Sequence, residues 1–381
     1  MSAPRHAIAA GRVFDGATMR SDAAVLVEGA RIAAVVPRAD VPATIEVRDL
    51  PGGAWLAPGF IDIQVNGGGD VLFNDAPTPD GIRTLVAAHR KLGTTTLLPT
   101  LISDTAEKMR AALAAVEAVI DAEPGLLGIH LEGPFLSPEK AGVHDRRMFR
   151  PPTASDLALI TAPRQGVTLV TLAPERVPEP FIRALAAAGV RIALGHSMAS
   201  YAQTKAAMAA GLSGFTHLFN AMPPLAAREP GPIAAALESQ QAWYGLIVDG
   251  IHVAPAMLQL ALRGAGHPML VSDAMPPVGG AKSSFMLNDE TILVREGHCA
   301  RRDGALAGAH LSMAQALRNC VRLLNVPLTD ALRFASAYPA RFLGLGEVLG
   351  KIAPGCRADL VAVDGSSLEV IETWVAGAAP T

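Results

Sequence analysis

The chain has 381 residues, of which 50% are hydrophobic and 18% are charged, with a formal net charge of −3. This composition excludes a disordered protein, which is poor in hydrophobic residues and rich in charge. It also excludes a general nucleic-acid binder, which needs clustered cations, and no apolar stretch approaches the roughly 18 residues that span a bilayer. Because the first residues lack the apolar segment of a signal peptide, we expect a cytoplasmic protein with no nucleic-acid or membrane partner.

Both ends of the chain are typical of β structure. The runs "HAIAAGRVFDG" (6–16) and "AAVLVEGARIAAVVP" (23–37) at the start resemble "LGKIAPGCRADLVAVD" (349–364) and "LEVIETWVAG" (368–377) at the end. Two or three strands bury too little surface to be stable alone. We therefore expect residues 1–56 and 345–381 to pair into one small β-sandwich domain, with residues 57–344 inserted between them.

The inserted residues alternate strand-like apolar runs with helical patterns such as "DTAEKMRAALAAVEAVIDAEPG" (104–125), which ends in a Pro-Gly stop. Eight such runs predict an α/β protein with a (β/α)8 TIM-like barrel. A doubly wound sheet is the alternative, but no GxGxxG turn follows the first run. The Gly-rich segment 275–310 predicts a hairpin after the eighth strand. The expected strands are 60–66, 94–100, 126–133, 168–174, 191–197, 214–220, 244–250 and 268–274.

Polar side chains gather where these strands end. In "PGFIDIQVNGGGD" (58–70), Asp62, Gln64 and Asn66 alternate with apolar residues, so we expect them to share one face of the strand. In a barrel, the carboxyl ends of all strands meet at one mouth, which carries the function. The other polar residues at predicted strand ends are His130, Glu132, His196, His217, Asn220, Asp249, His252 and Asp273.

These strand ends predict a metal site. A carboxylate and two imidazoles from different strands can hold one ion and leave a fourth position open. A single buried histidine is more often an ordinary core residue, but Glu132 is costly to bury unless it is paired or metal-bound. His130 shares a face with Glu132 and is either a fourth ligand or, as we favour, a partner of a ligand. Asp273 could accept a proton from the attacking water.

Several motifs resemble the amidohydrolase superfamily and, within it, the N-acetylglucosamine-6-phosphate deacetylase branch. The resemblance covers essentially the whole chain. "PGFID" and the closing "GKIAPGCRADLVAVD" are moderately specific, whereas "HLEGPFL" with "THLFNAM" and "REPG" is specific to the branch. The motifs are "APGFID" (57–62), "GIHLEGPFL" (128–136), "VTLAPE" (170–175), "LGHSMA" (194–199), "THLFNAMPP" (216–224), "REPG" (228–231), "DGIHV" (249–253) and "VSDAM" (271–275).

The resemblance implies one metal ion. Many superfamily members carry His-x-His at the end of the first strand and bind two ions, whereas this chain has Gln64 and Asn66 there. Amide oxygens are weak neutral ligands, so we expect a single divalent ion held by Glu132, His196 and His217. Zinc is favoured for these ligands, and iron, cobalt or manganese would also suit them.

The resemblance further implies hydrolytic deacetylation of a phosphorylated N-acetyl amino sugar. Asp273 is expected to act as general base and acid, and His144 to polarise the acetyl carbonyl. Arg228 is implied to reach the neighbouring subunit's site, which predicts a homodimer. The expected substrate-binding residues are Gln64, which would hydrogen-bond the water at the metal, and Asn220, Ala221, Arg228 and His252.

Other interpretations remain open from the sequence. Gln64 could simply cap the barrel mouth, and without the resemblance His144 and Arg228 would be read as solvated loop residues. The substrate could be the galactosamine epimer. A dihydroorotase or dipeptidase usually keeps the His-x-His pair that this chain lacks. A non-catalytic barrel is a further alternative, against which the intact set of Glu132, His196, His217 and Asp273 argues.

Overall fold

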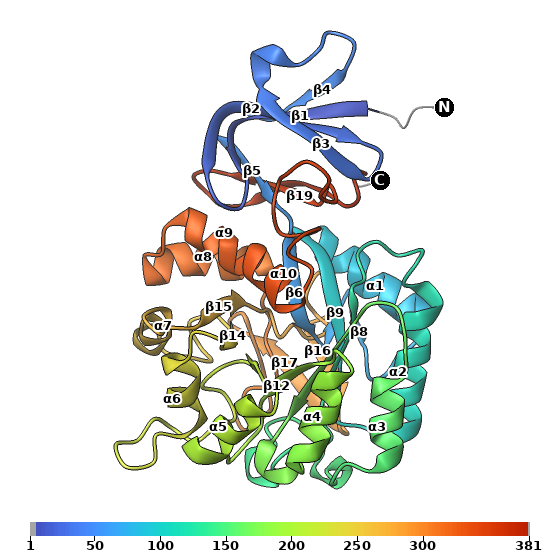
Figure 1. The fold of residues 1–381 in the computed structure, drawn as a ribbon, viewed down its shortest axis with the longest axis vertical. Helices are drawn as coiled ribbons and strands as arrows, with labels where there is room; N and C mark the ends of the chain where they lie inside the picture. The colour runs from blue at the N-terminus through green and yellow to red at the C-terminus, as the bar shows by residue number, and fades with distance from the viewer. Residues whose placement is uncertain (1–4, 380–381) are drawn as a thin grey trace.

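In the computed structural model, which describes residues 5–379, the two ends of the chain form a β domain beside a barrel (Figure 1). The seven strands of this domain form one sheet that branches at β1, because one part of β1 pairs with β4 and another with β5. Strand β19 pairs with β5, so the expected pairing of the two chain ends is confirmed. The domain limits at 56/57 and 344/345 stay a prediction. The strands are β1 (Arg5–Phe14), β2 (Met19–Glu28), β3 (Arg31–Pro37), β4 (Glu46–Asp49), β5 (Ala54–Pro58), β19 (Leu360–Asp364) and β20 (Val370–Trp374).

The middle of the chain forms the predicted (β/α)8 barrel. Its eight strands pair in parallel, each with the next along the chain, and helices cover the outside (Figure 1). The strands are β6 (Phe60–Val65), β9 (Thr94–Ile102), β10 (Gly128–Glu132), β11 (Val167–Leu172), β12 (Arg191–Leu194), β13 (Gly214–Phe215), β14 (Trp243–Leu246) and β15 (His267–Leu270). The helices are α1 (Pro79–Arg90), α2 (Ala106–Val119), α3 (Ala154–Thr161), α4 (Glu179–Ala187), α5 (Tyr201–Ala209), α6 (Gly231–Glu238), α7 (Pro255–Leu262), α8 (Met313–Leu324), α9 (Leu328–Ala335) and α10 (Ala337–Phe342).

Several strands are shorter than the sequence predicted. The extreme case is β13, which has two residues where 214–220 was expected. The chain leaves the extended conformation at His217, with φ of +32°, and again at Phe219, with φ of +80°. The polar residues at these strand ends therefore lie in turns beyond the strands.

The barrel closes without a regular ladder between its first and last strands. Strands β6 and β15 are the two ends of the eight-stranded order, and a single bridge, Val65 to Ala274, joins this seam. The backbone N–H groups of Asn66 and Gly67 both donate to the Ala274 carbonyl, at 3.0 and 2.9 Å. The register of β6 against β9 also shifts between Asp62 and Val65. The seam is thus the irregular part of an otherwise regular barrel.

The β domain lies at the end of the barrel where the strands begin. Strand β5 leads directly into β6, and helices α9 and α10 lie between the β domain and the barrel (Figure 1). The β domain does not cover the opposite end of the barrel, where the strands finish, so a functional site can lie there (Figure 1). In residues 5–379, no helix has both the length and the apolar character needed to cross a membrane.

The expected hairpin after the eighth strand is confirmed, with a third strand added. It consists of β16 (Ser284–Leu287), β17 (Glu290–Arg295) and β18 (His298–Ala300). Apolar residues of this sheet pack on Leu72, which lies after β6, and on Ile102, the last residue of β9. A two-stranded ribbon of β7 (Gly67–Gly68) and β8 (Val71–Leu72) lies at the same end of the barrel.

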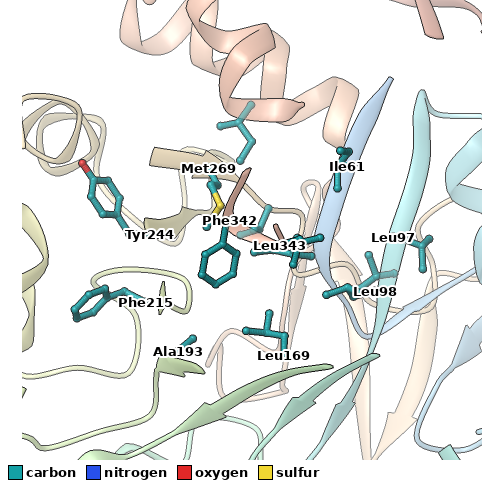
Figure 2. Close-up of a cluster of buried hydrophobic side chains, with 14 of the residues drawn as sticks. Ile61, Leu97, Leu98, Leu169, Ala193, Phe215, Tyr244, Met269, Phe342 and Leu343 are labelled. Carbon is teal, nitrogen blue, oxygen red and sulfur yellow. The ribbon is translucent and has the colours of Figure 1, made fainter. Parts of the chain in front are cut away.

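Helix α10 closes the opposite end of the barrel. Its last residue, Phe342, is 3% exposed and lies among Phe215, Met269 and Leu169 inside the barrel (Figure 2). A Cβ added at Gly214 would lie 2.9 Å from the Phe342 ring, so the ring uses space that this glycine leaves open. The apolar packing at this end supports the strands that carry the site at the other.

Replacing Phe342 by alanine should lower the free energy of unfolding by about 3–5 kcal/mol, because it removes a buried ring and leaves a cavity. The measurement is the shift of the denaturant midpoint at constant slope. The control is Met286→Ala, at a side chain that is 54% exposed, which should change stability by less than about 0.5 kcal/mol. Equal shifts for the two variants would contradict this account of the barrel floor.

Candidate metal centre

Three buried side chains from three barrel strands converge at the mouth of the barrel. Glu132 is the last residue of β10, and its Oε1 lies 3.1 Å from Nε2 of His196 and 3.2 Å from Nε2 of His217. The two Nε2 atoms are 3.1 Å apart. The structure therefore brings together the three predicted ligands as one group that can hold a metal ion.

The backbone at this site is unusual. His196, His217 and Asp273 follow the ends of different strands, and their φ angles are +48°, +32° and +49°. Residues other than glycine rarely adopt this left-handed backbone conformation, which costs on the order of 1–3 kcal/mol for each residue. The turns bring these three side chains to the buried mouth of the barrel. A strand that continued in the extended conformation would have carried the chain past the mouth.

The hydrogen bonds of the group favour a cation at its centre. His196 Nδ1 lies 2.7 Å from the Lys140 carbonyl, which can only accept, so Nδ1 carries a ring proton. Nε2 of the same ring faces the Glu132 carboxylate and Nε2 of His217. One carboxylate oxygen and two imidazole nitrogens, which are common metal ligands, thus converge in a buried space where the carboxylate needs positive charge beside it. A divalent cation fits this donor set.

The acid–base properties of the group agree with this. Burial alone would raise the pKa of Glu132, but the hydrogen bonds from His196 and His217 hold it well below its usual value. Burial would lower the pKa of His217, but the hydrogen bond and charge of Glu132 raise it overall. The carboxylate is therefore ionised and draws positive charge toward the imidazoles.

Asp273 lies beside this group and is held by two amides. Its Oδ1 accepts hydrogen bonds from Asn66 Nδ2 at 2.7 Å and from Gln64 Nε2 at 3.2 Å. The same Gln64 nitrogen lies 3.3–3.4 Å from both carboxylate oxygens of Glu132. Burial, and then the negative charge of Glu132, raise the pKa of Asp273. The Gln64 amide thus bridges the carboxylate of Glu132, an expected metal ligand, and Asp273, the expected base.

His144 reaches the same place from a loop. Its Nδ1 accepts from the backbone N–H of Ser103 at 3.2 Å and lies 2.9 Å from Ser103 Oγ. The proton of the neutral ring is therefore on Nε2, which lies 3.9 Å from Glu132 Oε1. Burial, and then the charge of His196, lower the pKa of His144 to about 3, so the ring is a neutral hydrogen-bond donor.

His130 does not join the ligands. Its two ring nitrogens lie against the hydroxyls of Thr100 and Thr171, at 3.3 and 2.7 Å. Burial lowers its pKa to about 4, so the ring is neutral. The fourth-ligand alternative is therefore not supported, because both nitrogens are already engaged inside the barrel.

A cavity of about 170 Å³ opens at the centre and includes most of the expected substrate-binding residues. Asn220, Ala221 and His252 all line it. His252 Nδ1 lies 2.5 Å from Oδ2 of Asp249, which fixes the ring. Arg228 does not line the cavity, because it lies exposed in the loop before α6.

Three supporting residues at the site were not predicted. Ser103 immediately follows β9 and could have been found by the strand-end argument that selected the other residues. Glu175 accepts hydrogen bonds from Ser197 Oγ and the Met198 N–H, so it fixes the turn after His196. Nothing in the sequence indicated that the Lys140 carbonyl would orient a ligand.

Comparisons with known proteins find relatives that are named as deacetylases of amino-sugar phosphates. A model of the amidohydrolase family matches residues 55–379, and a model of the NagA composite domain matches residues 6–55. The chain is 44% identical to an N-acetylgalactosamine-6-phosphate deacetylase of a Shewanella species, over 84% of this chain and 82% of that protein. It is 34% identical to the N-acetylglucosamine-6-phosphate deacetylase of Haemophilus influenzae, over 93% of this chain and 94% of that one. The crystal structure of the Pasteurella multocida N-acetylglucosamine-6-phosphate deacetylase superposes with a TM-score of 0.95 at 33% identity, covering 99% of this chain and all of that one.

Replacing His217 by alanine should reduce the bound metal from about one equivalent to below about 0.1 after gel filtration, because a three-ligand site loses one ligand. The matched control is His144→Ala, which removes a buried imidazole beside the same carboxylate and should keep about one equivalent. Elemental analysis of the purified proteins gives the stoichiometry. Full metal content in His217→Ala, or two tightly held equivalents in the unaltered protein, would contradict a single site with these ligands.

Proposed function

The chain belongs to the amidohydrolase family, and on that premise we propose that it hydrolyses N-acetyl-D-glucosamine 6-phosphate to D-glucosamine 6-phosphate and acetate. The observation that carries this proposal is the buried group of Glu132, His196 and His217 with Asp273 beside it. Relatives named as deacetylases of N-acetylglucosamine 6-phosphate or its galactosamine epimer, at 34–44% identity, support the substrate class. We place the reaction in amino-sugar catabolism and in the cytoplasm.

Glu132, His196 and His217 would hold one divalent cation. When bound, the cation would polarise the acetyl carbonyl and lower the pKa of water at its open position. One carboxylate with two imidazoles suits zinc best, and iron, cobalt and manganese accept the same ligands.

Asp273 moves the proton. Its Oδ1 is occupied by the two amides, and among the described residues no hydrogen bond engages Oδ2. This oxygen takes the proton of the attacking water and then passes it to the leaving nitrogen, which must become an amine. Asn66 and Gln64 hold the carboxylate in one orientation through both steps.

His144 polarises the acetyl carbonyl. Ser103 keeps the ring proton on Nε2, so the side chain points a neutral N–H toward the cavity. A neutral donor stabilises the charge that develops on the carbonyl oxygen and adds no positive charge beside the cation.

The phosphate of the substrate would be bound at the outer part of the cavity by His252, with Asn220 and the backbone of Ala221 nearby. Arg228 is exposed and does not line this cavity, so it does not complete this set within one chain. It lies in an exposed loop with Leu225, which is 43% exposed, and the connection leading into α6 extends from the body of the barrel (Figure 1). We therefore assign Arg228 to the site of the second subunit of a homodimer.

The galactosamine epimer is the second candidate substrate. The 44% identity to the Shewanella protein exceeds the 34% identity to the Haemophilus protein, and a protein of Escherichia coli O157:H7 with the galactosamine activity in its name is 35% identical. The two sugars differ only in the orientation of the hydroxyl at C4, so the acetyl group and the phosphate would use the same contacts.

The deciding experiment measures acetate release from both sugar phosphates side by side, with the metal-loaded protein and after removal of metal by a chelator. We expect hydrolysis that the chelator abolishes and added metal restores. Asp273→Asn keeps an acceptor for the two amides but cannot take a proton, so it should lower kcat by about 10²-fold or more. No acetate from either sugar with any of the four metals would refute the proposed function, and a normal rate for Asp273→Asn would refute the role of Asp273.

Arg228→Ala should raise KM for the phosphorylated sugar by about 10-fold or more, because a charge-assisted hydrogen bond is lost. KM for the unphosphorylated sugar should change little. The control is Arg83→Ala on helix α1, whose arginine is 52% exposed and pairs with Asp80. Equal losses on both sugars would contradict a phosphate contact.

Mixing the two variants also tests the second subunit's role. At substrate concentrations well below KM, co-expressed Arg228→Ala and Asp273→Asn chains should recover up to about a quarter of full activity, since half of the dimers are mixed and one of their two sites is complete. No recovery in confirmed mixed dimers would place Arg228 elsewhere.

A further inference from the structure

The seam of the barrel is bridged by side chains that the proposed mechanism does not use. Asp62 is fully buried, and its Oδ1 accepts hydrogen bonds from the backbone N–H of Gln64 at 3.2 Å and of Ser272 at 3.3 Å. Ser272 is on the far side of the seam, and its Oγ donates to the Gln64 carbonyl at 3.4 Å. Side chains therefore supply cross-seam bonds where a regular ladder is missing.

The two backbone segments that these bonds join carry the reacting machinery. Gln64 is one of the bridged residues, and Asp273 directly follows Ser272. The side chains of Gln64 and Asp273 meet across the seam at 3.2 Å. A change in the distance between the two segments at the seam would therefore change the distance between Asp273, the expected base, and the Gln64 amide that holds it.

We propose that Asp62 and Ser272 are positioning residues, which hold β6 and the end of β15 together so that Gln64 and Asp273 keep their productive geometry. This inference rests on the proposed function, where Asp273 handles the proton. A misplacement of about 1 Å in a catalytic group can lower a rate by about 10²-fold, so the spacing of the seam has a direct kinetic consequence.

The geometry at Asp62 requires an acceptor rather than a charge. Oδ1 makes both backbone bonds, whereas the buried Oδ2 has no hydrogen-bond partner among the described residues. Burial raises the pKa of Asp62 to about 7, so a neutral side chain of the same shape is close to its state near neutrality. Without Oδ1, two buried N–H groups would lose their acceptor, which is unfavourable in a protein interior.

The metal ligands lie on other strands. Glu132 ends β10, and His196 and His217 follow β12 and β13, so none of them is attached to β6 or β15. A loosened seam should therefore leave the bound metal in place and act on turnover alone. A purely structural role would instead lower metal content, stability and activity together.

The test compares Asp62→Ala with Asp62→Asn in the full-length, metal-loaded protein. We expect Asp62→Ala to lower kcat by about 10- to 100-fold with metal content unchanged and KM within about 3-fold of the unaltered protein. Asp62→Asn keeps Oδ1 and should stay within about 3-fold in kcat. The control is Ile61→Ala, the adjacent residue in the strand, which is 1% exposed and should lower stability while kcat stays within about 3-fold.

Three results would overturn the proposal: full kcat in Asp62→Ala, loss of metal in proportion to activity, or a rate for Asp62→Asn as low as that for Asp62→Ala. If Asp62→Ala does not fold, Ser272→Ala decides. It should lower kcat by about 3- to 10-fold with metal retained, and full kcat would overturn the proposal. An unaltered protein that releases no acetate would instead be a failure of the proposed function, so the two outcomes are distinguishable.

Discussion

The mouth of the barrel depends on one electrostatic constraint, which is that a carboxylate and two imidazoles meet in a buried space. Glu132 Oε1 and the Nε2 atoms of His196 and His217 lie 3.1–3.2 Å from one another. In the low dielectric of a protein interior, the buried carboxylate is stable only with positive charge beside it, from the imidazoles or from a bound cation. The surrounding polar groups follow from this need, since the Lys140 carbonyl orients one imidazole and the amide of Gln64 donates to the carboxylate. The chemistry of the site is therefore built around a cation.

The scaffold holds this arrangement against its local cost. Three residues of the site have left-handed backbone conformations, each of which is unfavourable by itself. They persist because the strands before them are locked into the barrel, whose far end is filled by Phe342 and its apolar neighbours (Figure 2). Rigid packing at one end of the strands thus permits strained turns at the other, which is where function lies in barrels of this type.

Local patterns predicted the barrel, and local patterns together with the family resemblance predicted the group of Glu132, His196 and His217. Alternating apolar runs predict strands, and the cost of burying Glu132 singled out a site at their ends. The sequence did not reveal backbone turns or the partners that side chains find across the fold. The lengths of several strands were overestimated because backbone turns such as that at His217 leave no mark in residue type. The alternation in β6 predicted a shared face for Asp62, Gln64 and Asn66, but it did not indicate that Asp62 accepts from backbone N–H groups or that the two amides donate to carboxylates. The position of Ser103 after a strand could be predicted, but its contact with a histidine 41 residues away could not.

Under the proposal of a single cation, the two amides stand where two imidazoles and a second cation would otherwise be expected. Glu132 and Asp273 are buried carboxylates close enough for the charge of one to raise the pKa of the other. A second cation would cancel that repulsion. Here Gln64 and Asn66 direct N–H groups at the carboxylates, and each hydrogen bond to a charged group contributes about 1.5–3 kcal/mol. These donors stabilise the anions less than a full charge does, so Asp273 keeps a greater affinity for protons than it would beside a second ion. In the proposed mechanism Asp273 takes a proton from water and returns it to an amine, and that difference would favour this role.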